Sequence, residues 1–309
     1  MAYRVLISDK IEPVCPEILK AAGIGADERP GLTAEGLLEI IGDYDGQIVR
    51  SATKVTAAVL EKGRAGRLRI VGRAGAGVDN IDVEAAGRLG VKVVNTPGLN
   101  SNAVAELAVG FAFMLARNLA LADSGLRAGR WEKKSLSGFE LSGKTFGLLG
   151  FGNVGKLVAR KALGLGMKAI AFDPLVPADE IRKDGTVPVA LDDLWREADF
   201  ISLHLPKNKD TLNIVDARAL AAFKRTAYLI NCARGGLVDE AALFEALSAK
   251  RIAGAAFDVF SAEPPGESPL FGLPNFIAAP HLGASTLEAQ LGVARRSAEL
   301  LVEFFQSQG

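Results

Sequence analysis

Short runs rich in β-branched residues alternate with helix-like stretches along the whole of this chain of 309 residues. This alternation is typical of parallel βαβ units, not of a β-sandwich or a helical bundle. In the first third the expected strands read YRVLIS, GQIVR, LRIVG and VKVVN, and helices are expected around residues 16–22, 34–41, 56–61 and 83–89. A second series begins at TFGLLG and continues through KAIAFD, DFISLHLP, AYLINCARGG, GAAFDVF and FIAAP. The sequence therefore predicts an α/β fold with two doubly wound parallel sheets.

A long apolar-rich helical pattern separates the two series. It runs from Asn102 to about Ala128, with Ser101 or Asn102 as its cap and Gly129 as its end. Its residues Leu107, Phe111, Met114 and Leu115 offer more apolar surface than one domain edge covers, which predicts a homodimer built around this helix.

The last helical pattern, in STLEAQLGVARRSAELLVEFF, begins with a capping box at Ser285 and Glu288. An amphipathic helix at this place must cover another part of the protein. We therefore expect an outer domain of residues 1–98 plus 283–309, an inner domain of residues 99–282, and a cleft between them in which ligands bind. The apolar face of this helix consists of Leu287, Leu291, Ala294, Ala298, Leu301 and Phe305.

Composition excludes several classes of function. Acidic and basic residues balance at 36 each, so no basic field attracts nucleic acid, and we expect small molecules or further copies of the chain as partners. Cys15 and Cys232 lie far apart and match no metal-ligand spacing, which fits a reducing compartment and no metal site. The N-terminus lacks signal-peptide zones, and the apolar run Leu107–Ala116 is too short to cross a bilayer, so we expect a cytoplasmic protein without membrane contact.

A glycine-rich loop predicts a dinucleotide site in the inner domain. Gly150-x-Gly152-x-x-Gly155 directly follows a predicted strand and opens a helix, and Asp173 ends the next strand 18 residues later. In this Rossmann-like context the helix N-terminus meets the pyrophosphate, and Asp173 accepts hydrogen bonds from the ribose. A carboxylate there repels a 2′-phosphate, which favours NAD over NADP. The alternative is a glycine turn that only packs the helix on the strand.

Three polar residues follow later strands of the inner domain. Arg234 lies in NCARGGLVDEAAL, where Asp239 is expected to cap the next helix, Glu263 lies in AFDVFSAEPP, and His281 lies in APHLGAST. Each residue alone also has a structural explanation: Arg234 as a surface charge, Glu263 as a loop acid before prolines, and His281 as a capping neighbour. The carboxyl ends of parallel strands lie at one edge of a sheet, so we expect Arg234, Glu263 and His281 to form one reaction site. Oxidising a secondary alcohol needs a proton acceptor that titrates near neutrality, which histidine supplies, and a carboxylate favours its imidazolium form.

Five segments carry a resemblance to a known family. VGRAGAGVDNID, GLLGFGNVGKLVA, NCARGGLVDEAAL, AAFDVFSAEP and PHLGAST resemble, in this order, the signature blocks of the D-isomer-specific 2-hydroxyacid dehydrogenases. The resemblance covers essentially the whole chain and is strongest to the branch that acts on D-3-phosphoglycerate. It implies an outer substrate-binding domain, an inner NAD-binding domain, and oxidation of D-3-phosphoglycerate or the reverse reduction.

The resemblance also implies roles for individual residues. Arg234 holds the carboxylate and carbonyl of the substrate, His281 is the acid–base residue, and Glu263 pairs with it. The cofactor-binding residues are Gly150, Gly152, Asn153, Val154, Gly155, Asp173, His204, Pro206, Cys232, Ala233, Asp258 and Gly283, with packing as the alternative role of His204. The substrate-binding residues are Arg50, Arg73, Ala74, Gly75, Ala76 and Gly77, with the two arginines at the phosphate.

Several alternatives stay open. A reductase of glyoxylate, hydroxypyruvate or another 2-keto acid is the second enzyme hypothesis, and an NAD-sensing binding protein is the hypothesis from another class. Lys133 or Lys134 supplies a third phosphate contact from a partner subunit, or both are ordinary solvated charges. The chain departs from the family at FKRTAYLIN, which lacks the usual Pro-Gly turn, and it stops at Gly309, so we expect no C-terminal regulatory domains.

Overall fold

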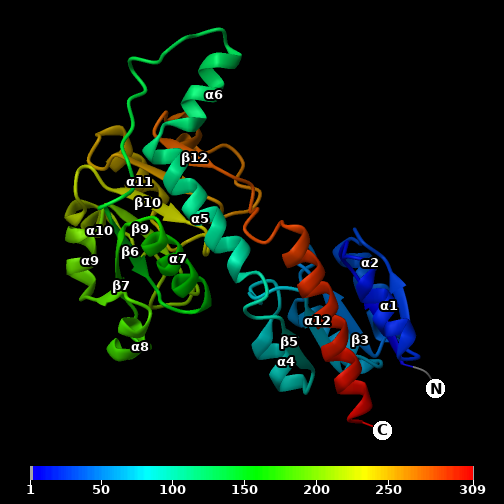
Figure 1. Cartoon of the computed structure of the whole chain (residues 1–309). Coiled ribbons are helices and arrows are strands. Elements are labelled where there is room, and N and C mark those ends of the chain that lie inside the picture. The colour runs from blue at the N-terminus through cyan, green and yellow to red at the C-terminus, as the bar shows by residue number, and fades with distance from the viewer. Residues whose placement is uncertain (1–2, 309) are drawn as a thin grey trace. The chain divides into compact units, whose positions relative to one another are not determined.

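The computed structural model describes residues 3–308, which form two compact units. One unit comprises the chain up to Asn100 and from Ala284 on, and the other comprises Ser101–Gly283. Each unit has one parallel sheet with helices on both faces (Figure 1). The α/β fold with two parallel sheets that the sequence predicts is therefore confirmed.

The first unit is built on a five-stranded sheet with the order β2-β1-β3-β4-β5. The chain turns to one side of β1 to form β2 and to the other side to form β3, so the topological switch point lies between β1 and β3. The strands are β1 (Arg4–Ile7), β2 (Gly25–Glu28), β3 (Gly46–Val49), β4 (Ile70–Arg73) and β5 (Lys92–Asn95). The helices are α1 (Val14–Ala21), α2 (Ala34–Ile40), η1 (Ile41–Asp43), α3 (Ala57–Ala65), α4 (Val83–Leu89) and α12 (Leu287–Gln306).

The edge strand β2 is a feature that the sequence did not predict. Its residues, GADE, contain no β-branched side chain and none is fully buried. The strand forms because every residue pairs in register with β1, from Arg4 opposite Gly25 to Ile7 opposite Glu28. Charged edge strands also resist pairing with other chains.

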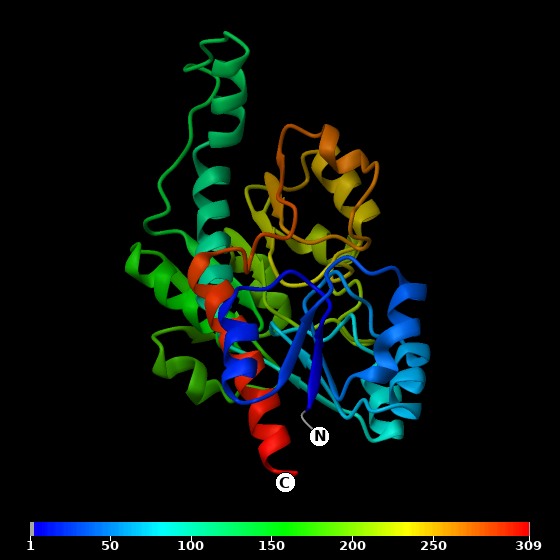
Figure 2. The same cartoon turned by 90° about the vertical axis from the view of Figure 1, so that its right-hand side faces the viewer.

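Alternating side chains of the strands build a core on each face of this sheet. Val5 and Ile7 point toward α1 and α12, whereas Leu6 points toward α2, α3 and α4. Figure 2 shows α1 and α12 side by side on one face. A Cβ on Gly72 would lie 2.6 Å from Leu301 Cδ1, so this glycine allows α12 to approach the sheet closely.

Helix α12 begins differently from the sequence prediction. Its cap is Thr286, whose Oγ1 accepts from Ala289 N at 3.2 Å, and not a box of Ser285 and Glu288. Leu287 and Leu291 are 77% and 47% exposed, so they do not belong to the buried face. The first two turns bury Ala289 and Val293 instead, because the helix meets the core with a different side there. The rest of the predicted face, Ala294, Ala298, Leu301 and Phe305, is buried.

The second unit is built on a seven-stranded sheet with the order β12-β11-β10-β9-β6-β7-β8, and its switch point lies between β6 and β9. One core lies under α5, α7 and α8, and the other lies under α9, α10 and α11. The strands are β6 (Thr145–Leu149), β7 (Lys168–Phe172), β8 (Val187–Pro188), β9 (Phe200–Leu203), β10 (Tyr228–Asn231), β11 (Gly254–Phe257) and β12 (Phe276–Ala278). The helices are α5 (Ser101–Ala116), α6 (Leu119–Arg127), α7 (Asn153–Gly164), α8 (Ala178–Lys183), α9 (Leu191–Glu197), α10 (Ala217–Ala222), α11 (Glu240–Ser248) and η2 (Pro269–Gly272).

The long helix expected at 102–128 is two helices. Asn118 adopts a left-handed conformation, with φ of +53°, and α5 and α6 meet there at 66°. Phe111 and Leu115 are buried in the core of the unit, and Leu107 and Met114 pack against it, so these four residues are not the free apolar surface that the sequence suggested. The exposed apolar residues of this region are instead Phe113, Leu119, Leu121, Leu126 and Trp131.

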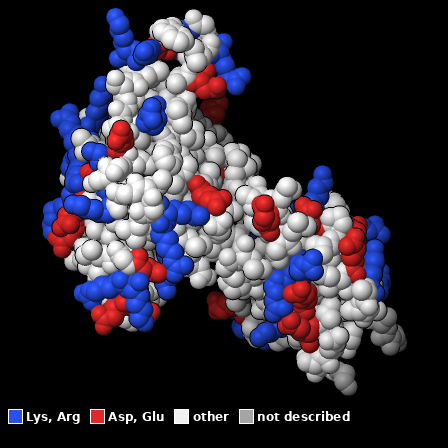
Figure 3. All heavy atoms as spheres, in the orientation of Figure 1, with Lys and Arg blue, Asp and Glu red and all other residues white. Residues whose placement is uncertain are grey.

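The helices and the surface charges bear on contact with a membrane or a nucleic acid. Among residues 3–308 no single helix is long and apolar enough to cross a bilayer. The bent pair α5 and α6 reaches the length and apolar composition of a membrane span only when the two helices are taken together. On the face shown in Figure 3, both units carry Lys and Arg interspersed with Asp and Glu.

Candidate active site

The functional residues that the sequence predicts in the second unit follow the carboxyl ends of its strands. The glycine-rich loop follows β6, Asp173 follows β7, His204 follows β9, Arg234 follows β10, Asp258 follows β11, and His281 follows β12. Parallel pairing places all these ends at one edge of the sheet.

The glycine-rich loop leaves an open space at the start of α7. Gly150 has φ of +100°, and a Cβ there would lie 2.7 Å from the His204 carbonyl oxygen. A Cβ on Gly155 would lie 2.3 Å from the Gly150 carbonyl oxygen, so α7 packs directly on the loop. Gly152, the N-cap, has no atom near its Cβ position and no side chain to cap the helix. This cradle of helix amides, continued by Asn153 and Val154, fits a diphosphate.

Asp173 joins the end of β7 to this loop. Its Oδ2 accepts from Phe151 N at 2.7 Å, and its Oδ1 accepts from Leu175 N at 2.9 Å. A carboxylate oxygen has two lone pairs, so each oxygen can accept a further hydrogen bond from a ribose hydroxyl. The Phe151 contact also fixes the loop relative to β7.

His204 lies beneath the glycine-rich loop. Burial lowers the pKa of its imidazole to about 3, so the ring is neutral at physiological pH. Its Nδ1 and Nε2 are buried and make no hydrogen bond within residues 3–308. Two unsatisfied polar atoms beside the cradle are a further observation that fits a bound polar group. Pro206, two residues on, is exposed, and its carbonyl accepts from Thr211 Oγ1 at 2.7 Å.

The turn after β10 is shaped by a residue that the sequence reasoning missed. Asn231 Oδ1 accepts from Ala233 N at 3.1 Å, and Asn231 Nδ2 donates to Arg234 O at 2.9 Å. The Arg234 Nη1 in turn donates to Ala233 O at 2.6 Å. Burial, with a smaller effect of Asp258, raises the pKa of the Cys232 thiol well above its ordinary value. An Asn directly after a short apolar run, AYLI, was the available signal.

A tight turn precedes β10, and a helix cap follows it. Before the strand, Ala227 N donates to Lys224 O at 2.9 Å, so FKRTAYLIN forms a tight turn without the usual Pro-Gly pair. After it, Asp239 caps α11 by accepting from Ala241 N and Ala242 N, which confirms that prediction.

Glu263 and His281 form the pair that the resemblance implies. His281 Nδ1 lies 2.7 Å from Glu263 Oε2, and Glu263 Oε1 accepts from Phe260 N at 3.1 Å. With Nδ1 held by a carboxylate, Nε2 is the nitrogen left to exchange a proton with a ligand. Both side chains are partly exposed, so a ligand can reach them.

Asp258 fixes the backbone of this pair. His281 has φ of +55°, an uncommon conformation for a residue with a side chain. Its N–H donates to Asp258 O at 2.8 Å, while Leu282 N and Gly283 N donate to the Asp258 carboxylate at 2.6 and 2.7 Å. Burial raises the pKa of Asp258, and the two amides oppose that shift. The structure thus brings Asp258, Glu263, His281 and Gly283 together, and Arg234 follows β10, the strand that pairs with β11.

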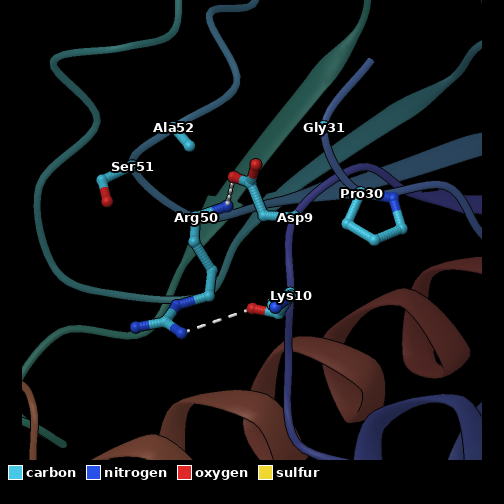
Figure 4. Close-up of a pocket in the computed structure, with 7 residues that line it drawn as sticks. All are labelled: Asp9, Lys10, Pro30, Gly31, Arg50, Ser51 and Ala52. Carbon is cyan, nitrogen blue, oxygen red and sulfur yellow. Dashed lines mark hydrogen bonds between the residues drawn. The ribbon is translucent and has the colours of Figure 1, made fainter.

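The predicted substrate residues of the first unit follow β3 and β4. Arg50 borders a cavity of about 440 Å³, and Arg73 does not (Figure 4). The Arg73 side chain folds back over Gly75, where a Cβ would meet its Nη1, and it donates to Ala74 O at 3.3 Å. Asn95 Nδ2 donates to Ala76 O at 2.6 Å and holds the loop that continues to Gly77. Lys133 and Lys134 are exposed and lie in the other unit.

Comparison with known proteins agrees with this arrangement. A family model described as the D-isomer specific 2-hydroxyacid dehydrogenase, NAD binding domain, matches residues 109–283. D-3-phosphoglycerate dehydrogenase of Homo sapiens is 44% identical over 301 residues, which are 97% of this chain and 56% of that protein. Hydroxypyruvate reductase of Thermotoga maritima is 43% identical over 310 residues, which are 99% of each chain. The apo-structure of D-lactate dehydrogenase from Escherichia coli is similar with a TM-score of 0.85 at 26% identity, over 98% of this chain and 97% of that one.

The lengths of these relatives differ. The chain spans about half the length of the D-3-phosphoglycerate dehydrogenases that it matches and nearly all of the hydroxypyruvate reductase.

We expect His204 to reduce stability in acid. Its folded-state pKa of about 3 lies below the ordinary 6.5, so the unfolded chain binds the proton first. The stability that neutral His204 contributes is fully present above pH 6.5 and falls by as much as about 1.4 kcal/mol per pH unit between pH 6.5 and 3. Chemical denaturation at several pH values should show a flatter profile for His204→Asn. A variant profile identical to that of the unmodified protein contradicts this prediction.

Proposed function

Because the chain belongs to the D-isomer specific 2-hydroxyacid dehydrogenases, we propose that it interconverts D-3-phosphoglycerate and 3-phosphohydroxypyruvate. Its cofactor is NAD, the dinucleotide named in the matching family model. The choice of substrate rests on the cavity beside Arg50, because its cationic lining suits a phosphate. Relatives named D-3-phosphoglycerate dehydrogenase at 42–46% identity support the same choice.

The geometry of the second unit supports a role for each polar residue. When bound, NAD accepts the hydride that leaves C2 of the hydroxy acid. His281 takes the hydroxyl proton on Nε2 and returns it in the reverse direction, while Nδ1 stays on Glu263. The Glu263 carboxylate stabilises the imidazolium so formed. Arg234 binds the substrate carboxylate and C2 oxygen, since a guanidinium presents paired donors to such a group.

The remaining predicted residues divide between the cofactor and the substrate. We assign the second unit to NAD, with Gly150, Gly152 and Gly155 at the diphosphate, Asp173 at the ribose, and Cys232 and Asp258 at the nicotinamide. We assign the first unit to the substrate, with Arg50 and Arg73 at the phosphate and the amides of residues 74–77 at the carboxylate. The Asp173 carboxylate at the end of β7 supports NAD over NADP, because its negative charge repels a 2′-phosphate.

A second candidate is reduction of hydroxypyruvate or another unphosphorylated keto acid. It is supported by the Thermotoga maritima hydroxypyruvate reductase, which matches this chain over nearly its whole length. Turnover of NADH with a panel of 2-keto acids separates the two candidates, and no turnover on any acid would favour an NAD-sensing binding protein.

The exposed apolar residues of α6 and just after it support a homodimer. Leu119, Leu121, Leu126 and Trp131 are all exposed, Leu126 by 58% and Trp131 by 80%, and an exposed apolar surface larger than single scattered residues marks an interaction site. Lys133 and Lys134 lie two and three residues after Trp131, so a dimer contact there places them near the partner. Two buried free cysteines, Cys15 and Cys232, support a cytoplasmic location.

We expect His281→Ala to remove most turnover. Loss of acid–base catalysis lowers kcat by a factor on the order of a hundred to ten thousand. Affinity for NADH, followed by fluorescence titration, should change less than about twofold, since lost catalysis is not lost cofactor binding. Glu263→Gln keeps the shape of the partner but removes its charge, so an intermediate loss of about tenfold is expected. An unchanged kcat in His281→Ala refutes the mechanism.

The substrate assignment is tested on Arg50→Ala. Removing a charged hydrogen-bond partner costs about 1.5–3 kcal/mol, so KM for phosphohydroxypyruvate should rise roughly 10- to 100-fold. KM for hydroxypyruvate should barely change. Arg64→Ala serves as the control, because Arg64 is an exposed arginine of the same unit that does not border the cavity. Equal effects on both acids mean that Arg50 is structural, and an unmodified enzyme that prefers hydroxypyruvate supports the second candidate.

The dimer is tested by light scattering. The unmodified protein should have twice the mass of one chain, and the double variant Leu126→Asp with Trp131→Ser should have the mass of one. Leu175→Asp is the matched control, because Leu175 is 89% exposed elsewhere in the same unit and should leave the dimer intact. A monomeric unmodified protein at micromolar concentration rules out the dimer.

A further inference from the structure

The loop between β11 and η2 carries Glu263, and the place of this side chain depends on the first residues of the loop. Phe260 N donates to Glu263 Oε1 at 3.1 Å, while Glu263 Oε2 lies 2.7 Å from His281 Nδ1. The Phe260 ring is buried and packs edge-on against Phe271, with 5.5 Å between the ring centroids. The Phe260 amide therefore determines where Glu263 presents its second oxygen to His281.

The next residue of the loop, Ser261, is held by a carboxylate from another segment. Glu240 lies in the first turn of α11, and its Oε1 accepts from Ser261 N at 2.8 Å and from Ser261 Oγ at 2.7 Å. Hydrogen bonds to a carboxylate are stronger than those between neutral groups. Ser261 is exposed, so without Glu240 its amide and hydroxyl would bind water instead. Glu240 thus attaches the start of the Glu263 loop to α11.

The turn that carries Arg234 packs against the same segment. A Cβ on Gly235 would lie 1.7 Å from Phe260 O and 2.7 Å from Ser261 N. Only glycine leaves room for this contact between two backbones. Helix α11, which supplies Glu240, follows this turn in the chain. The backbone beside Arg234 and the start of α11 therefore both contact the two residues that precede the Glu263 side chain.

We propose that Glu240 is a positioning residue for the proton transfer. It acts through Ser261 and Phe260, whose backbone keeps the Glu263 carboxylate against His281. The inference deepens the proposed function and rests on it for the role of His281 as the acid–base residue. A catalytic group that moves by a fraction of an ångström loses much of its rate advantage, so the support of Glu263 contributes to kcat.

The positioning role is tested on Glu240→Ala, which removes both hydrogen bonds to Ser261. For the 2-keto acid that the enzyme reduces fastest, kcat should fall about tenfold, and NADH affinity should change less than about twofold. The solvent deuterium isotope effect on kcat should rise, because a poorly oriented imidazole makes the proton transfer slower. Glu240→Gln keeps an acceptor oxygen and should restore most of kcat.

Two further variants separate this role from a general loss of stability. Asp216→Ala removes the cap of α10, which accepts from Ala219 N at 2.8 Å, and should lower the melting temperature without changing kcat or the isotope effect. Ser261→Ala removes one of the two bonds to Glu240. Alone it should lower kcat about threefold, and in the Glu240→Ala background it should lower kcat no further, because the link is already broken. It also covers the case in which Glu240→Ala does not fold.

Nuclear magnetic resonance separates failure of this inference from failure of the proposed function. The chain contains two histidines, so comparison with His281→Ala identifies the ring signals of His281. At a fixed pH these signals should shift in Glu240→Ala and stay in place in Asp216→Ala. If the unmodified enzyme reduces no 2-keto acid, the proposed function is wrong, and the ring signals alone decide this inference. Unchanged kcat, isotope effect and ring signals in Glu240→Ala overturn it.

Discussion

An aspartate placed within two residues of a strand's end and bound to main-chain amides of a loop is the interaction on which the functional edges of both sheets depend. Asp9 holds the loop after β3, Asp173 holds the glycine-rich loop after β6, and Asp258 holds the turn after β12. Each carboxylate accepts at least two amide hydrogen bonds, and bonds to an ionised acceptor are stronger than neutral ones. Loops at sheet edges are otherwise the most mobile parts of such a fold. These acids convert them into rigid supports for Arg50, for the diphosphate cradle and for His281.

Sequence patterns predicted the parts of the molecule that depend on local order along the chain. The glycine spacing and the strand before it located the cradle at α7, and the order of Arg234, Glu263 and His281 after successive strands followed from parallel pairing. The 2.7 Å contact between Glu263 and His281 required the resemblance to a known family, because a separation of 18 positions along the chain carries no distance information of its own.

The features that sequence reasoning missed depend on contacts between distant segments. Strand β2 has no strand-like composition and exists through its pairing with β1. The break at Asn118 occurs inside a continuous apolar pattern, because one residue adopts a left-handed conformation. Asn231 and Asn80 look like ordinary turn residues, and only the folded chain shows that their amide groups bridge two loop positions. A helix pattern such as that of α12 likewise gives the period of the buried face but not where that face meets the core.

The first unit consists of two segments that precede and follow the second unit in the sequence, and this has a consequence for its folding during synthesis. Helix α12 covers the face of the five-stranded sheet that carries Val5, Ile7 and Ile48, yet it is translated only after the whole of the second unit. A nascent chain on the ribosome must therefore carry an uncovered hydrophobic sheet, shielded only by α1, while an entire domain emerges and folds. Because this apolar surface stays exposed until α12 is made, we expect the nascent chain to depend on chaperones and to be prone to aggregation during synthesis.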